Sequence, residues 1–329
     1  MPVRVLVALG GNAMTGEDGS ATPEAQQAAI HQAMQAVADL IADGHDVVLT
    51  HGNGPQVGNL LVKNELAAAT VPPVPLDWCG AQTQGTIGFT IMNELEPALA
   101  RRGVDRPVAT LVSRTRVDAD DPAFQDPAKP VGRFLTREEA EPLIALGQNW
   151  QDLGPKGWRR VVPSPEPREI LETRALRALL DRGFVVVAAG GGGIPVVREP
   201  DGSLRGVEAV IDKDLTAALL ARSVEADVLV IATDVEHAMI NYGTPEQEPV
   251  RDVDVDRARE LVAEGHFARG SMGPKMEAAI RFASSGDGFA VITSLEAIRP
   301  ALRREVGTIV QRRHAQIPNP DPTERVTHA

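Results

Sequence analysis

Short apolar segments alternate along the chain with longer segments in which apolar residues recur at helical spacing. Apolar runs of this kind are typical of strands buried on both faces, as in a parallel sheet covered by helices. The pattern therefore predicts an α/β fold. The predicted strands are 3–9, 46–50, 107–112, 184–189, 228–232 and 289–293, and the predicted helices are 23–42, 79–102, 167–182, 213–223 and 274–284.

Two of these helices carry start signals in the sequence. Thr22 precedes a proline and a glutamate, and Ser164 precedes two prolines before the apolar residue Ile170. A hydroxyl side chain followed by proline is typical of the first turn of a helix. We expect a helix to begin at each place.

The alternation breaks between about residues 114 and 165, where seven prolines lie among polar residues. A structureless loop of this length is uncommon in a compact protein, so we predict a small protruding subdomain or flap at 114–165. Residues 1–113 and 166–310 would then form one sandwich with two lobes. The polar, proline-containing residues 311–329 would form a loose C-terminal tail.

Composition excludes several classes of protein. The 329 residues carry 33 Lys and Arg against 45 Asp and Glu, and this net charge of −12 disfavours a general surface for nucleic acid or for anionic membranes. No apolar run approaches the ~18 residues of a membrane span, and the first residues predict a strand rather than a secretion signal. The single cysteine, Cys79, cannot form an internal disulfide. We therefore expect a cytoplasmic location.

Three of the predicted strands end in glycine-rich turns, at residues 10–12, 52–54 and 190–193. Each turn by itself is an ordinary connector, and the first matches neither G-x-G-x-x-G nor the Walker pattern. The carboxyl ends of parallel strands meet at one edge of a sheet, where ligands bind. Repetition of the glycine turn therefore predicts a cleft lined with backbone N–H groups, which favour anions.

Two lysines stand at predicted helix starts. Lys213 lies between Asp212 and Asp214, and Lys275 follows the Gly273-Pro274 turn. Phosphoryl transfer needs backbone N–H groups around the phosphate oxygens, lysines that neutralise charge, and a divalent metal on the nucleotide, but no protein nucleophile. For the Asp-Lys-Asp sequence alone, a solvated capping cluster remains the alternative.

Together these motifs resemble the carbamate kinases, within the amino acid kinase family, over nearly the full chain. The segments that carry the resemblance are 8–13, 51–60, 85–88, 129–132, 157–165, 190–193, 206–214, 240–243 and 270–275. The resemblance implies a three-layer α/β/α sandwich with an eight-stranded, mainly parallel sheet, a homodimer and a small protruding subdomain. The implied reaction is ATP + carbamate ⇌ ADP + carbamoyl phosphate with Mg²⁺, often run toward ATP in arginine breakdown.

The resemblance also implies roles for individual residues. The catalytic residues would be Gly10, Gly11, Asn12, Lys129, Lys213, Asp214 and Lys275. Carbamate would be bound by Gly52, Asn53 and Gly54. The nucleotide site would comprise Gly190, Gly191, Gly192, Gly193, Asp212, Thr233, Tyr242, Met272 and Gly273. Mg²⁺ would be held mainly by the nucleotide phosphates, with no metal site in the protein.

One segment departs from the family pattern, because members commonly carry tyrosine near the positions of His237 or Met239. An apolar, adaptable Met239 can pack on a purine, so we expect altered nucleotide affinity rather than its loss.

Three other functions agree less well with the sequence. Another amino acid kinase would bind a larger carboxylate and need an extra arginine or polar clamp, which the sequence does not place near residues 52–54. The presence of Lys129, Lys213, Asp214 and Lys275 disfavours a nucleotide-binding regulator without catalysis. The absence of G-x-G-x-x-G from the turn after the first strand disfavours a nicotinamide-dependent dehydrogenase.

Overall fold

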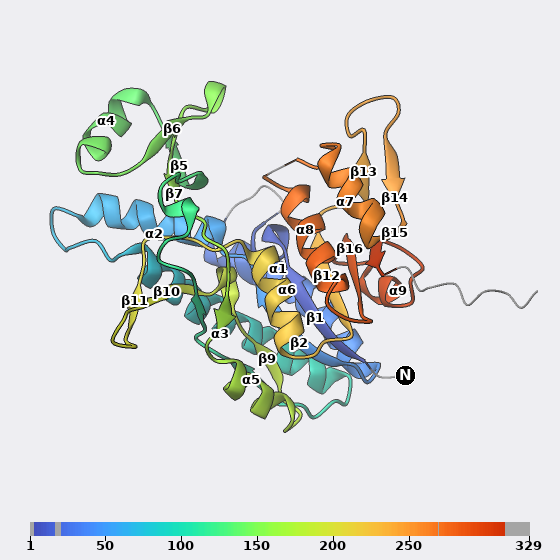
Figure 1. The fold of residues 1–329 in the computed structure, drawn as a ribbon. Helices are drawn as coiled ribbons and strands as arrows, with labels where there is room; N and C mark the ends of the chain where they lie inside the picture. The colour runs from blue at the N-terminus through green and yellow to red at the C-terminus, as the bar shows by residue number, and fades with distance from the viewer. Residues whose placement is uncertain (1–2, 17–20, 269, 313–329) are drawn as a thin grey trace, which may run out of the picture.

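The computed structural model describes residues 3–16, 21–268 and 270–312, and its centre is an eight-stranded sheet (Figure 1). Among the described strands of this sheet, only the neighbours β16 and β17 are antiparallel. In spatial order the strands are β15 (Asp252–Asp254), β17 (Thr308–Gln311), β16 (Phe289–Ser294), β12 (Val228–Thr233), β1 (Arg4–Leu9), β2 (Asp46–His51), β9 (Val185–Val187) and β3 (Val108–Thr110). The prediction of a mainly parallel, eight-stranded sheet is confirmed.

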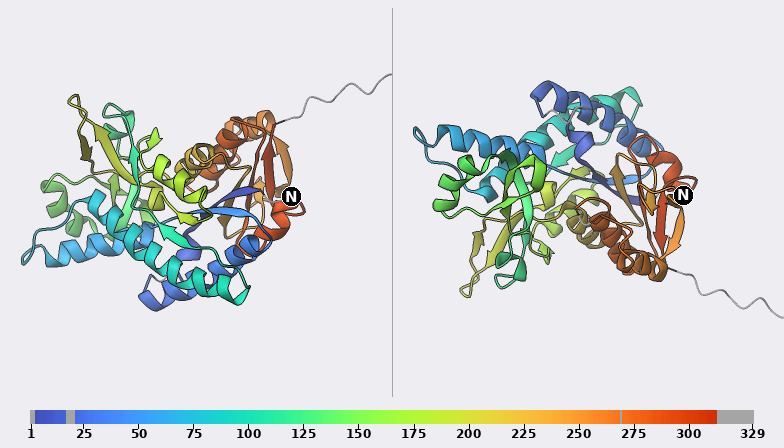
Figure 2. Two further views of the ribbon diagram at one scale, coloured as in Figure 1. Left: turned by 90° about the horizontal axis from the view of Figure 1, so that it is seen from below. Right: turned by 90° about the horizontal axis from the view of Figure 1, so that it is seen from above.

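Helices cover both faces of this sheet, as the two further views in Figure 2 show. Successive side chains of a strand point to opposite faces, and in β1 Val5 and Val7 enter one core while Leu6 and Ala8 enter the other. The helices of the first core are α1 (Pro23–Ala42), α3 (Leu76–Arg101) and α9 (Ile298–Leu302). The helices of the second core are α5 (Thr173–Leu180), α6 (Lys213–Ser223), α7 (Val255–Ala263) and α8 (Met272–Ala283). The predicted three-layer sandwich is confirmed.

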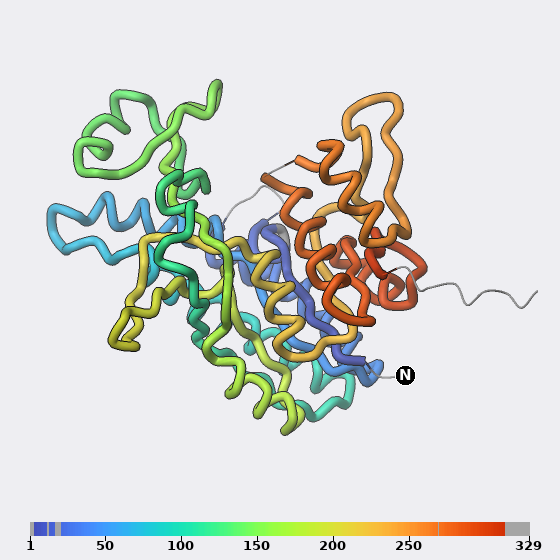
Figure 3. The backbone as a smooth tube through the Cα atoms, in the orientation of Figure 1, coloured from blue at the N-terminus to red at the C-terminus, as the bar shows by residue number. Residues whose placement is uncertain are grey.

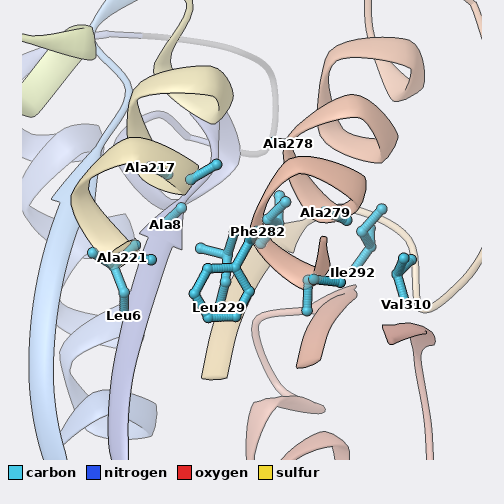
Figure 4. Close-up of a cluster of buried hydrophobic side chains, with 14 of the residues drawn as sticks. Leu6, Ala8, Ala217, Ala221, Leu229, Ala278, Ala279, Phe282, Ile292 and Val310 are labelled. Atoms are coloured by element: carbon cyan, nitrogen blue, oxygen red, sulfur yellow. The ribbon is translucent and has the colours of Figure 1, made fainter. Parts of the chain in front are cut away.

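Figure 4 shows part of the second core, where α6 and α8 pack side by side over the sheet. Small alanines such as Ala217 of α6 and Ala278 of α8 belong to this core and let both helices approach closely, and Phe282 packs beside Leu229. This close packing matters for the site, because α6 and α8 both begin at the same edge of the sheet.

All six predicted strands occur, with ends that shift by a few residues, and α1 and α6 have the predicted bounds. The Thr22 start signal is confirmed, because its side chain accepts a hydrogen bond from the backbone N–H of Ala25. The Ser164 signal is wrong: the backbone N–H of Arg168 donates to the carbonyl of Arg116, and β8 (Glu169–Ile170) pairs with β4 (Arg114–Arg116). Helix α5 therefore begins only at Thr173.

A small three-stranded sheet stands apart from the main sheet at the upper left of Figure 1. Its order is β5 (Lys129–Leu135), β7 (Trp158–Val162) and β6 (Trp150–Asp152), and α4 (Arg137–Ala145) completes it with a core of its own. These elements fall inside the predicted insertion at 114–165. Strand β4, however, belongs to a different four-stranded sheet with β8, β10 (Ile194–Arg198) and β11 (Leu204–Gly206), so the small sheet itself spans only 129–162.

The small sheet and a hairpin of β13 (Ala238–Ile240) and β14 (Glu248–Val250) rise on either side of α6 and α8, as the tube in Figure 3 shows. The small sheet rests on α2 (Gly54–Ala67), because Gly58 of that helix lies against Gly132 of β5. None of the described helices is long and apolar enough to cross a membrane. Of the predicted tail, Gln311 ends β17 and residues 313–329 lie outside the described part of the chain.

Candidate active site

A cavity of about 660 Å³ opens where the carboxyl ends of the central strands meet the small sheet. This is the edge at which open α/β sheets bind ligands. Residues that line it from the strand ends are Gly11, Gly52, Asn53, Gly54 and Gly191. Residues that line it from α6, α8 and the small sheet include Asp212, Lys213, Asp214, Ser271, Pro274, Lys275, Lys129, Gly132, Arg133 and Arg159.

The lining of this cavity is positively charged, although the chain as a whole carries a net charge of −12. Five cationic side chains face it, against the two carboxylates of Asp212 and Asp214. A cleft lined by an excess of one sign of charge concentrates ligands of the opposite sign. The cavity is therefore suited to an anion.

A buried carboxylate holds two of these lysines together. Asp214 is 5% exposed and accepts hydrogen bonds from Nζ of Lys213 at 2.6 Å and from Nζ of Lys275 at 3.0 Å. Burial raises the pKa of Asp214, but the charges of the two lysines outweigh burial and lower the pKa to about 2. An ammonium group has three donors, so each lysine keeps donors for a ligand.

The start of α6 is fixed by Asp212, whose carboxylate accepts from the backbone N–H of Asp214 at 2.9 Å. The other carboxylate oxygen accepts from Nζ of Lys129 at 2.9 Å. Lys129 comes from β5 of the small sheet, 83 residues earlier in the sequence. The structure thus brings the four charged residues predicted to be catalytic, Lys129, Lys213, Asp214 and Lys275, into one cavity.

The turns after β1 and β2 contribute differently. Gly10 packs against β12, where a Cβ atom would lie 2.7 Å from the carbonyl oxygen of Ala232, whereas Gly11 faces open space in the cavity. Asn12 is the second residue of the 3₁₀ turn Gly11–Met14. After β2, Asn53 donates through Nδ2 to Oγ1 of Thr83 at 2.8 Å. Gly11 and the 52–54 turn therefore place bare backbone at the cavity.

His51, at the end of β2, is 1% exposed, and its Nδ1 is 2.9 Å from the carbonyl oxygen of Gly52. Burial is the largest influence on this imidazole and lowers its pKa to about 4. A neutral ring bonded to the backbone stabilises the turn and is not placed to act as a general base.

The expectation that Gly190–Gly193 line the nucleotide site needs correction. A Cβ atom on Gly190 would lie 2.2 Å from Nε2 of His51, and one on Gly193 would lie 2.0 Å from Oγ1 of Thr115. Gly192 likewise abuts the carbonyl oxygen of Ile211. These three glycines are needed because protein atoms approach them, and only Gly191 lines the main cavity, beside Asn53.

A second cavity, of about 530 Å³, lies between the end of β12, the β13–β14 hairpin and α8. The predicted nucleotide residues Thr233, Tyr242 and Met272 line it, together with Met239 and His237. His237 is nearly buried, and its Nε2 accepts from the backbone N–H of Gly307 at 3.3 Å. The two cavities adjoin, because Lys275 and Ser271 line both.

Two predicted nucleotide residues lie elsewhere. Asp212 lines the main cavity and does not line the second one. Gly273 lines neither cavity: it lies in the first turn of α8, and its backbone N–H donates to the carbonyl of Ala268 at 2.9 Å. In the described residues there is no cluster of three or more His, Cys, Asp or Glu that could hold a metal ion.

Sequence reasoning missed two cations, Arg133 and Arg159, which line the main cavity with residues 52–54. The argument that no arginine lies near that turn is therefore wrong, because the small sheet folds over it. The sequence does contain a feature that points to Arg159, because the adjacent arginines at 159 and 160 lie in one of the segments that carry the family resemblance.

The sequence model of the amino acid kinase family matches residues 3–294. The chain belongs to the amino acid kinase family. It is 48% identical over 315 residues to the carbamate kinase of Thermococcus kodakarensis, covering 94% of this chain and 99% of that protein. It is 45% identical to a carbamate kinase-like protein of Escherichia coli, with the same coverage of both chains. The solved structure of Giardia lamblia carbamate kinase bound to AMP-PNP superposes with a TM-score of 0.90 at 39% identity, covering 95% of this chain and 99% of that one.

Proposed function

We propose that this chain is a carbamate kinase that transfers a phosphoryl group reversibly between ATP and carbamate. The observation that carries the proposal is the buried Asp214 with its two lysines in the main cavity, of which Lys275 also lines the second cavity. The carbamate kinases to which the chain is similar over nearly its whole length support it.

The charged residues of the main cavity have separate tasks in this reaction. Lys213 and Lys275 stabilise the negative charge on the phosphoryl group as it moves, and Asp214 keeps both ammonium groups in position. Lys129 covers the substrate from the small sheet, and Asp212 holds the ammonium group of Lys129 in position.

Backbone groups complete the substrate side. Gly10, Gly11 and Asn12 bind the phosphoryl group in transit, and Gly52, Asn53 and Gly54 bind carbamate at the start of α2, where the free N–H groups of a helix favour an anion. No nucleophilic side chain is needed, because phosphoryl transfer depends on position and charge neutralisation.

The second cavity would hold the nucleotide, ATP or ADP, with Met239, Tyr242 and Met272 around the base. Thr233 borders both this cavity and the β1 turn, next to the phosphates. Both carboxylates of the main cavity are bonded to lysines, which fits a Mg²⁺ ion brought in mainly by the nucleotide phosphates. Such an ion supplies charge neutralisation on the phosphates.

The test is ATP synthesis from ADP and carbamoyl phosphate with Mg²⁺. The wild-type protein should produce ATP well above the blank, and Lys213→Ala should lose nearly all turnover while keeping its circular dichroism spectrum. Absence of wild-type turnover, with ADP bound normally in calorimetry, would instead favour a nucleotide-binding regulator.

The second candidate is another amino acid kinase that phosphorylates a larger carboxylate. Arg133 and Arg159 favour it, since they supply the additional cations that such a substrate requires. A panel of acetylglutamate, glutamate, aspartate and carbamate with ADP release as the common readout separates the two: turnover restricted to carbamate supports the first proposal.

We also propose a homodimer. Trp78 and Phe89 of α3 are each 60% exposed and lie eleven residues apart, about three helical turns, so they share one face. A second copy of this chain would cover these aromatic side chains, and light scattering at the monomer mass would contradict this. The cytoplasm is the proposed location, supported by the buried, free thiol of Cys79, and ATP synthesis in arginine breakdown is the proposed use.

A further inference from the structure

Arg159 differs from the other cations of the main cavity in its partners. Lys129, Lys213 and Lys275 each bond to a carboxylate of the cavity, and Arg133 pairs with Glu65 at 3.3 Å. Within the described part of the chain, Arg159 has no carboxylate within salt-bridge distance. Its one hydrogen bond there runs from Nε to the carbonyl oxygen of Gly132 at 3.0 Å.

The backbone of the small sheet fixes this side chain. The pairing of β5 with β7 is irregular between Val131 and Phe134, where β5 carries extra residues. Irregularities of this kind redirect side chains and are frequent beside active sites. Gly132 adopts φ +70°, a conformation that favours glycine, and its carbonyl accepts from Arg159. The guanidinium carbon also lies 4.9 Å from the ring centroid of Phe134.

These contacts hold Nε and one face of the guanidinium but leave its two terminal nitrogens without a hydrogen-bond partner among the described residues. A guanidinium offers parallel N–H groups that match a carboxylate or a phosphate. Partial burial also lowers the pKa of Arg159, because it removes part of the water around the charged guanidinium. An anion bound in the cavity would compensate the positive charge of the Arg159 guanidinium.

Arg159 stands on the acceptor side of the cavity. Gly132, its anchor, lies against Gly58 and Leu61 of α2, the helix whose first turn contains Gly54. Arg159 does not line the second cavity, where the nucleotide is proposed to bind.

We propose that Arg159 is a specificity-determining residue that binds the anionic acceptor, carbamate or carbamoyl phosphate, directly through its terminal nitrogens. This inference rests on the proposed function. The small sheet would then recognise the acceptor with two side chains, Lys129 and Arg159, of which only Arg159 is free of an internal carboxylate in the described residues.

The experiment compares Arg159→Gln and Arg159→Lys with a neighbour, Arg160→Gln. Arg160 lies in the same strand but does not line the cavity, and it pairs with Glu208 at 3.1 Å. We expect R159Q to raise the KM for carbamoyl phosphate about 10- to 100-fold, as for a lost hydrogen bond to a charged group. The KM for ADP should change less than about twofold. R159K should recover part of the loss, because lysine restores the charge without the parallel N–H groups of a guanidinium. R160Q should have the same KM values as the wild type.

Calorimetry with phosphonoacetamide, in which a methylene replaces the bridging C–O–P oxygen of carbamoyl phosphate, provides a readout without turnover. Weaker binding by R159Q than by R160Q supports the proposal. An active wild type with an unchanged carbamoyl phosphate KM in R159Q overturns the role of Arg159 and leaves the proposed function standing. An inactive wild type whose phosphonoacetamide binding still depends on Arg159 overturns the reaction alone, and an inactive wild type that does not bind phosphonoacetamide overturns both.

Discussion

Replacing Asp214 with asparagine keeps the size of the side chain but removes the charge that holds two lysines. The carboxylate is 5% exposed, and its partners Lys213 and Lys275 have side chains that are 13% and 15% exposed. An asparagine can accept from one lysine through its oxygen and turns its amide donors toward the other. The substitution therefore leaves two ammonium groups near each other without a counterion.

The size of the effect follows from the pKa of Asp214. A pKa of about 2 in the folded protein, against an ordinary value of 3.8, means that the fold favours the ionised carboxyl by about 2 kcal/mol. Removing one partner of a buried ion pair costs about 3–5 kcal/mol, because the remaining charges lose their compensation. We expect a loss of about 3 kcal/mol in the free energy of unfolding. For 329 residues, at about 2.1 cal/mol/K of unfolding entropy per residue, this lowers Tm by about 4 °C.

Thermal unfolding at pH 7, followed by circular dichroism, measures this change. The matched control is Asp256→Asn: Asp256 is the second residue of α7, as Asp214 is of α6, but its side chain is 86% exposed and forms a surface ion pair with Arg259. The control should shift Tm by less than about 1 °C, as expected for a surface ion pair. Asp214→Asn should also lose most ATP synthesis. A Tm equal to that of the control would refute the reasoning about the buried carboxylate.

Two further predictions concern the turn behind the cavity. The pKa of His51 is about 4 in the folded protein, below its ordinary value of 6.5. The unfolded chain therefore takes up the proton first as the pH falls. The stability that neutral His51 contributes is present above pH 6.5 and is lost toward pH 4. Because of this group, the free energy of unfolding measured in urea should fall by about 2 kcal/mol between pH 7 and pH 5. His51→Asn should reduce this pH dependence, and an equal pH dependence in both proteins contradicts the lowered pKa of His51. Gly190→Ala would place a Cβ atom 2.2 Å from Nε2 of the buried His51 and should cost about 1–3 kcal/mol. Gly80→Ala in α3, where no atom lies within 4 Å of the added carbon, should not destabilise, and equal urea midpoints for the two variants would count against a tight packing at Gly190.

The sequence predicted the central strands because each is a run of buried apolar residues, a signal that needs no knowledge of its neighbours. It did not predict β15 and β17, which have three and four residues and lie toward one end of the sheet. In β15, charged residues flank a single buried valine, so the pattern resembles a loop. The proline signal at 164–167 failed for a similar reason, because proline also suits the approach to a strand such as β8.

The charged residues of the site also differ in how far the sequence could predict their contacts. Asp212 and Asp214 flank Lys213 in the sequence, so their association could be inferred locally. The bond between Asp214 and Lys275 joins residues 61 positions apart, and only the family resemblance pointed to it. Arg159 carried no assigned role, because its position depends on the irregular pairing of two strands and on where their sheet folds back over α2.

The four-glycine turn shows what a glycine pattern can and cannot predict. A glycine run at a strand end indicates that something approaches the backbone too closely for a side chain, and this holds at residues 190–193. The approaching groups, however, are His51, Thr115 and the backbone of Ile211, from three segments that the sequence keeps far apart. Since a ligand and a buried side chain impose the same requirement on the backbone, a glycine run predicts close approach but not the identity of the partner. The residues that bind the anion are better indicated by charge that the fold leaves uncompensated, as at Arg159.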